Sequence, residues 1–304
     1  MKVYKAYGKY VLQIGFGLIG SAVYDRLRLS EGFYHHSSLA VPWEDQTERI
    51  AAVRQILTEL KSMFPVDRDA PKELTILWSA GRTSFASSEV KCKAELATYT
   101  QIVRALSQEL PIENWQVRFV LCSSAGGVYE GIGQIKDLEK VSPCRPYGAQ
   151  KLAQEQVLQE IWSSRGASFL ILRVSSVYGS LVSGHRKGLI DNLICNTRRH
   201  LPTNIFGQPD TLRDFVFAGD VADQIARSLQ DFPKVDVQIL ASGKPASIFA
   251  VIKMVERQLG RKPYVSFTSE HSLANHIVYP PAMIESTFKS TSLSIGVAKI
   301  LMQS

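Results

Sequence analysis

Short apolar runs alternate along the first 175 residues with longer segments in which apolar residues recur at helical spacing. The runs predict strands over residues 10–14, 38–42, 74–78, 118–122 and 168–173, and the periodic segments predict helices over residues 22–29, 46–63, 89–109 and 146–164. Strands that are apolar at nearly every position are typical of a parallel sheet with helices on both faces. The pattern therefore predicts an α/β fold, a Rossmann-type doubly wound parallel sheet.

The alternation becomes irregular after residue 177. We expect helices over residues 188–199, 219–229 and 246–259, and loops over residues 180–188 and 201–213. The chain is accordingly divided into a sheet domain over residues 1–175, to which residues 212–242 return, and a smaller C-terminal lobe over residues 176–304. The lobe is expected to lie over the ligand-binding edge of the sheet and to be mainly substrate-binding.

The first predicted strand runs directly into a turn with three glycines, made of Gly15, Phe16, Gly17, Leu18, Ile19 and Gly20. Such glycines allow a tight turn and let the backbone approach a pyrophosphate at the positive end of the following helix. Because the turn lies between a strand and a helix, it predicts a dinucleotide site rather than a merely tight turn. Ala80 and Gly81 follow a further predicted strand, at the same edge of the sheet.

The end of the second predicted strand is unusual for a dinucleotide site. An acidic partner of the adenosine ribose is expected there, but the residue is Trp43. Glu44 and Asp45 follow, and each is placed either to reach the 2′-hydroxyl or to favour the start of the next helix. The choice between NAD and NADP stays open, with NAD preferred.

Composition and charge narrow the class of protein. The 304 residues are 45% hydrophobic and 21% charged, and the formal charge is +7. The basic residues are spread along the chain without an aromatic-basic motif, so we expect no nucleic-acid partner, and an anionic small substrate suits the charge. No apolar stretch is long enough to predict a membrane span or a signal peptide, so we expect a cytoplasmic protein without a membrane partner. Four scattered cysteines predict no metal site.

Tyr147 and Lys151 are four residues apart in a predicted helix. The i and i+4 positions share one helix face, so the phenol and the ammonium group can approach a single point. The pair suits proton transfer, although an aromatic residue four before a lysine is also common on helix surfaces. Ser123 and Ser124 end the strand that precedes this helix.

Several blocks occur together in one order, namely residues 15–20, 119–129, 146–151, 172–179 and 213–222. In these blocks the chain resembles the extended short-chain dehydrogenase/reductase family, in its nucleotide-sugar epimerase/dehydratase branch. The resemblance implies that Tyr147 is the acid-base residue, that Lys151 binds the nicotinamide ribose and favours the phenolate, and that Ser124 or Ser123 hydrogen-bonds the reacting oxygen.

The resemblance also implies the other contacts of the site. The cofactor-binding residues would be Gly15, Phe16, Gly17, Leu18, Ile19, Gly20, Trp43, Ala80, Gly81, Lys151 and Val174. The substrate-binding residues would be Arg82, Ser124, Ser176 and Arg213, with Arg213 on a substrate diphosphate. By the same resemblance, the helices over residues 89–109 and 146–164 would pair into a homodimer.

Departures from the family pattern refine these expectations. Ala125 stands where many relatives have the catalytic hydroxyl, so Ser124 is preferred and Ser123 is the alternative. Gly126 and Gly127 stand where dehydratases of the branch carry an acidic pair, which disfavours a dehydratase. Glu95 stands where asparagine is usual, and Ser176 replaces another asparagine.

Three hypotheses follow for the function. The first is an NAD(P)-dependent sugar-nucleotide 4-epimerase that acts by transient oxidation, with Tyr147 as acid and base. The second is an NADPH-dependent 4-keto-sugar-nucleotide reductase that uses the same residues in one direction. The third is a non-catalytic family member that binds a nucleotide. In the first two, the partner is a small-molecule nucleotide sugar.

Overall fold

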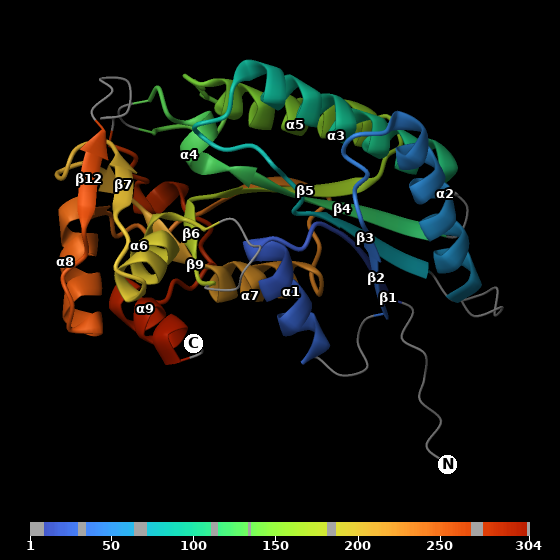
Figure 1. Cartoon of the computed structure of the whole chain (residues 1–304). Coiled ribbons are helices and arrows are strands. Elements are labelled where there is room, and N and C mark those ends of the chain that lie inside the picture. The colour runs from blue at the N-terminus through green and yellow to red at the C-terminus, as the bar shows by residue number, and fades with distance from the viewer. Residues whose placement is uncertain are drawn as a thin grey trace, which may run out of the picture.

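A six-stranded parallel sheet forms the centre of the molecule (Figure 1). The computed structural model describes residues 9–29, 35–63, 72–110, 115–132, 135–180, 187–268 and 276–302. The strand order is β10-β5-β4-β3-β1-β2. The strands are β1 (Lys9–Ile14), β2 (His35–Leu39), β3 (Lys72–Trp78), β4 (Trp115–Ser124), β5 (Ser168–Val174) and β10 (Val235–Leu240). β10 thus comes from beyond residue 175 and pairs in parallel with β5.

Helices cover both faces of the sheet, as the apolar runs predict (Figure 1). One face carries α2 (Gln46–Met63), α3 (Glu89–Glu109) and α5 (Pro146–Ser163), and the other carries α1 (Leu18–Arg28) and α7 (Ala218–Ser228). Alternate strand residues enter the two cores: Leu12 and Ile14 pack on the α2, α3 and α5 side, and Val11 packs on the α1 and α7 side. The Rossmann-type fold is confirmed.

The remaining elements form a smaller lobe with its own core. Its helices are α6 (Leu189–Arg198), α8 (Ile248–Leu259) and α9 (Leu293–Met302). Short strands pair between them: β6 (Ser176–Tyr178) with β9 (Phe215–Phe217), β7 (Thr203–Phe206) with β12 (Val265–Thr268), and β8 (Leu212–Arg213) with β11 (Ala246–Ser247). Two further short helices are α4 (Ala125–Val128) and η2 (Pro281–Met283). None of the helices in the described ranges is long and apolar enough to cross a membrane.

The structure corrects three predicted boundaries. The second strand is His35–Leu39, not residues 38–42, because its last residue pairs with Ile14 and the chain then meets Pro42, which has no N–H to donate. Helix α1 begins at Leu18, directly after Gly17 in extended conformation, and not at residue 22. The predicted loop over residues 201–213 contains β7 and β8. Of the predicted loop over residues 180–188, residues 181–186 lie outside the described ranges.

Candidate active site

A pocket of about 650 Å³ opens at the carboxyl ends of the sheet strands. The strand order reverses between β1 and β3, and ligands of doubly wound sheets bind at such a reversal. The pocket wall includes most of the residues singled out in the sequence: Gly17, Leu18, Ile19, Ala80, Gly81, Ser123, Ser124, Tyr147, Lys151, Val174, Ser176 and Arg213. Gly15, Phe16, Gly20, Trp43 and Arg82 do not belong to the wall.

A side chain of the preceding strand stabilises the glycine turn by hydrogen bonds. The buried amide of Gln13 donates to the carbonyl oxygens of Gly15, at 3.0 Å, and Gly20, at 2.8 Å. Gly15 has a φ of +103°, and a Cβ there would lie 2.4 Å from the Ala80 nitrogen, so only glycine fits between β1 and β3.

The turn leaves room for a ligand group at the start of α1. Nothing lies within 4 Å of the place a Cβ would take at Gly17, which lines the pocket and precedes the first helical residue. The free N–H groups and the dipole of a helix N-terminus favour an anion at this position. The residues present therefore fit the pyrophosphate of a dinucleotide.

Tyr147 and Lys151 enter the pocket from the first turns of α5. Pro146 occupies the first helical position, which needs no N–H donor. Tyr147 and Lys151 lie on one side of the helix because they are four residues apart. The Tyr147 ring packs against Phe85, with 5.1 Å between ring centroids, and would touch a Cβ at Gly127 at 3.3 Å. Lys151 is buried, and its ammonium donates to Gln154 Oε1 at 3.0 Å. A buried lysine and a phenol in one pocket form an arrangement suited to proton transfer.

The two serines at the end of β4 have different surroundings. Ser123 Oγ donates to Glu155 Oε1 at 2.5 Å, and Glu155 is paired with Arg173 at 2.7 Å in a fully buried cluster. Ser124 is half-buried, and its Oγ accepts from Gly127 N at 3.2 Å. Within the described ranges, the Ser124 hydroxyl donates to no protein group. It is therefore the serine with a proton to offer to a ligand.

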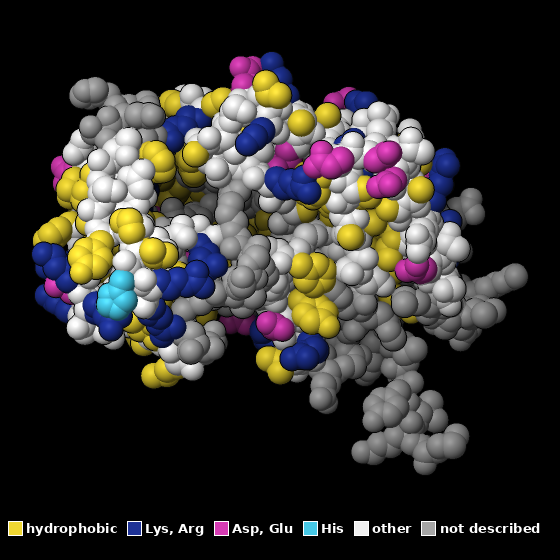
Figure 2. Space-filling view, in the orientation of Figure 1, with side chains coloured by type: hydrophobic (Ala, Val, Ile, Leu, Met, Phe, Trp, Pro, Cys, Tyr) yellow, Lys and Arg dark blue, Asp and Glu magenta, His cyan; other side chains and the backbone are white. Residues whose placement is uncertain are grey.

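The far end of the pocket is basic and contains one buried carboxylate. Glu130 forms an ion pair with Arg145 at 2.9 Å, and Arg213 also faces it. Burial raises the pKa of Glu130, while the charges of Arg145 and Arg213 act in the opposite direction. Two guanidinium groups around one carboxylate leave a positive balance, which suits an anionic group such as a diphosphate. On the face shown in Figure 2, Lys and Arg side chains also gather over the smaller lobe.

The turn between β2 and α2 contains the residues considered above as partners of an adenosine ribose. Asp45 accepts from the N–H groups of Thr47 and Glu48, so it caps α2. Glu44 pairs with Arg82 at 2.5 Å, and the Arg82 guanidinium lies 5.1 Å from the centre of the Trp43 ring. The Arg82 side chain therefore lies against Trp43 and Glu44, outside the pocket wall.

Sequence reasoning missed several residues of this site. Phe85 covers the Tyr147 ring, and Arg145 lies 5.6 Å from the centre of the Phe85 ring. Glu95 was noted only as a departure from a family pattern, but it is buried between the turn after β3 and α5. These residues lie outside any glycine or hydroxyl motif, so no local signal points to them.

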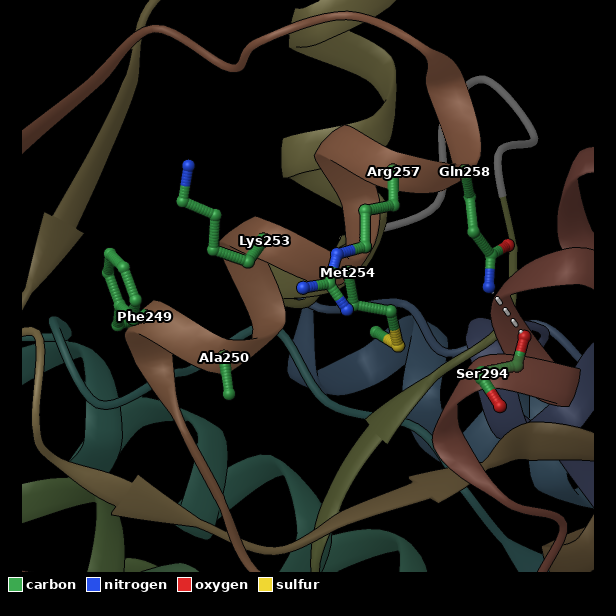
Figure 3. A pocket seen from close by; sticks show the side chains of 7 residues that line it. All are labelled: Phe249, Ala250, Lys253, Met254, Arg257, Gln258 and Ser294. Carbon is green, nitrogen blue, oxygen red and sulfur yellow. Dashed lines mark hydrogen bonds between the residues drawn. The ribbon is translucent and has the colours of Figure 1, made fainter.

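A second concavity, of about 450 Å³, lies on the smaller lobe (Figure 3). It is lined by one face of α8, including Phe249, Met254 and Arg257, and by Ser294 of α9. Gln258 donates across it to the Ser294 carbonyl at 2.8 Å. Its lining has neither a glycine turn nor an acid-base pair, so we place the candidate site in the larger pocket.

The chain is similar to a known protein family and to several named proteins. The model of the NAD dependent epimerase/dehydratase family matches residues 15–239. A dTDP-4-dehydro-6-deoxyglucose reductase from Escherichia coli is 25% identical over 196 residues, which is 62% of each chain. A putative UDP-glucose 4-epimerase from Methanocaldococcus jannaschii is 27% identical over 146 residues, which is 47% of each chain. The chain thus matches about half to three fifths of the length of these curated relatives.

Solved structures match over nearly the whole chain. UDP-glucose 4-epimerase from Thermus thermophilus in complex with NAD has a TM-score of 0.73 at 19% identity, covering 95% of this chain and 96% of that chain. UDP-glucuronic acid 4-epimerase from Bacillus cereus in complex with UDP-glucuronic acid and NAD has a TM-score of 0.69 at 20% identity, covering 97% and 99%. At these identities the likeness concerns the fold.

Proposed function

This chain belongs to the NAD-dependent epimerase/dehydratase family, and on that premise we propose that it is a sugar-nucleotide 4-epimerase that uses tightly held NAD. The observation that carries the proposal is the meeting of four parts in one pocket: the glycine turn, Ser124, and the pair Tyr147 and Lys151. Enzymes of this short-chain dehydrogenase/reductase type include both epimerases and reductases, and the comparisons contain both.

The bound nicotinamide would supply a hydride acceptor and donor. Tyr147 would take the proton of the C4 hydroxyl while the hydride on C4 passes to the cofactor, which would leave a 4-keto sugar. Lys151 would hold the nicotinamide ribose, and Ser124 would donate a hydrogen bond to the oxygen at C4. The keto sugar would then rotate in the pocket, accept the hydride back on its other face and regain the proton from Tyr147, so that no net oxidation occurs.

The proposed substrate is a nucleotide sugar. Arg213 and Arg145 line the basic end of the pocket, and a guanidinium binds phosphate oxygens in a bidentate manner. Structural relatives in complex with UDP-sugars and NAD support this class of ligand. The predicted homodimer through α3 and α5 stays a prediction, which sedimentation at working concentration tests.

The second candidate is a reductase of a 4-keto nucleotide sugar, favoured by the similarity to the Escherichia coli reductase over 62% of the chain. To separate the two, the purified protein is denatured and any released dinucleotide is identified, and UDP-glucose, UDP-glucuronic acid and a dTDP-4-keto sugar are offered to the native protein. Released NAD with interconversion of a C4 epimer pair supports the epimerase. A cofactor-free preparation that consumes NADPH with the keto sugar refutes it in favour of the reductase.

A further inference from the structure

Glu95 is a buried carboxylate beside the site, behind the turn whose Ala80, Gly81 and Thr83 line the pocket, with an exposed fraction of 4%. Its Oε2 accepts from the backbone N–H groups of Arg82, at 2.5 Å, and Thr83, at 2.8 Å. Its Oε1 accepts from the side-chain amide of Gln150 at 2.7 Å. Three donors from two other segments thus satisfy a charge that would otherwise be costly to bury.

The hydrogen bonds close into a ring. Thr83 Oγ1 donates to Gln150 Oε1 at 2.7 Å, and Gln150 directly precedes Lys151 in α5. The ring therefore joins three segments: α3, which carries Glu95, the turn after β3, and the first turns of α5. Gln150 and Thr83 are themselves buried, at 3% and 4% exposure, and Thr83 also belongs to the pocket wall.

The ring lies close to the glycine of the turn after β3 and to the Lys151 ammonium group. A Cβ added at Gly81 would lie 3.2 Å from Glu95 Oε1 and 3.9 Å from Lys151 Nζ. The carboxylate and the ammonium group therefore both approach the backbone of the turn whose Ala80 and Gly81 line the pocket. A shift of this turn would therefore move part of the pocket wall and change the surroundings of the Lys151 ammonium group at the same time.

We propose that Glu95 is a positioning residue, which fixes the turn at residues 81–83 and the catalytic helix α5 relative to each other. The inference rests on the proposed function for the roles of Tyr147 and Lys151. Glu95 itself acts only through the turn and through Gln150. Without its carboxylate, the two backbone N–H groups and the Gln150 amide lose their acceptor, and both segments lose their common anchor.

The ring suggests variants that differ in whether its hydrogen bonds can re-form. In Glu95→Gln, the new amide oxygen can still accept from Arg82 N and Thr83 N. Its NH₂ can donate to Gln150 if the Gln150 amide turns over, and Gln150 can then donate to the Thr83 hydroxyl. The ring of hydrogen bonds can therefore re-form in Glu95→Gln, whereas it cannot in Glu95→Ala. Combining Glu95→Gln with Thr83→Val also removes the Thr83 hydroxyl, which is the acceptor that the turned Gln150 amide needs. The ring of hydrogen bonds then cannot re-form.

The test measures hydrogen exchange in the peptides that cover residues 79–88 and 147–158, and NAD affinity by titration. For Glu95→Ala we expect exchange at least about tenfold faster in both peptides and NAD binding about tenfold weaker. Glu95→Gln should restore exchange in both peptides, and the double variant should resemble Glu95→Ala. Glu89→Gln is the matched control, since Glu89 lies on the same helix in an exposed pair with Lys93.

A third readout separates positioning from general damage. Where the wild type turns over a nucleotide sugar, Glu95→Ala should lower kcat at least about tenfold and change KM by less than about threefold, because Arg213 is not part of the ring. Faster exchange in the turn alone, or a Glu95→Gln variant as impaired as Glu95→Ala, would overturn the inference. If Glu95→Ala does not fold, the double variant against Thr83→Val alone decides the question. A wild type that binds NAD but converts no nucleotide sugar refutes the proposed function alone, since exchange and NAD affinity need no turnover.

Discussion

The two serines at the end of β4 provide the sharpest test of the acid-base site. Ser124→Ala removes the hydroxyl that faces the pocket and is proposed to contact the reacting oxygen. Loss of one such donor lowers kcat by about 10²–10³-fold in comparable sites. Its structural role is small, because Ser124 caps only the four-residue helix α4 through Gly127 N, and a lost cap costs about 1 kcal/mol.

Ser123→Ala should have the opposite profile. Glu155 loses the Ser123 hydroxyl but keeps Arg173, which donates from Nε at 3.1 Å and from Nη2 at 2.7 Å. A hydrogen bond to a charged group contributes about 1.5–3 kcal/mol, and a chain of this size loses roughly 2–4 °C in Tm for each kcal/mol. We therefore expect a Tm lower by about 3–12 °C, with turnover per folded molecule within about threefold of wild type.

The assay combines thermal unfolding with initial rates on whichever nucleotide sugar the wild type converts. Rates are divided by the folded fraction, so that instability is not mistaken for lost catalysis. If Ser123→Ala abolishes turnover and Ser124→Ala spares it, the assignment of Ser124 is refuted, and the buried cluster around Glu155 must open during the reaction.

Three further predictions address the phenol, the glycine turn and a buried acid. Tyr147→Phe keeps the ring packing against Phe85, so Tm and NAD affinity should stay near wild type while kcat falls about 10²–10⁴-fold; undiminished turnover contradicts the mechanism. Gly15→Ala must displace the backbone of Ser79 and Ala80 and strain a positive φ, which costs at least about 1–3 kcal/mol. Gly17→Ala has room and should weaken NAD binding at unchanged stability; equal Tm losses in a melting assay refute this distinction. Burial raises the pKa of Asp191 to about 6, above its unfolded value, so the folded state holds this proton more tightly and the free energy of unfolding falls as pH rises from about 4 to about 6. Asp191→Asn, which keeps an acceptor for Gly179 N, should remove that part of the slope; urea-unfolding free energies of the variant and the wild type that change in parallel across this pH range would show otherwise.

The sequence alone predicted the features that depend on neighbours along the chain. Strand and helix periodicity identified the parallel sheet, because burial on both faces makes most positions of its inner strands apolar. The glycine turn was identifiable because its backbone conformation admits no side chain at Gly15. Tyr147 and Lys151 were paired by helix geometry, which is also local.

Tertiary structure decided the features that depend on distant segments. Ser123 and Ser124 are adjacent, and only the position of Glu155 and Arg173 shows which hydroxyl is already engaged. Glu95 in α3 meets Gln150 in α5, and no spacing between positions 55 residues apart predicts that contact. Sequence periodicity determines which face of an element is buried, whereas the packing of one element on another determines which polar side chains meet there and which of them remains available to a ligand.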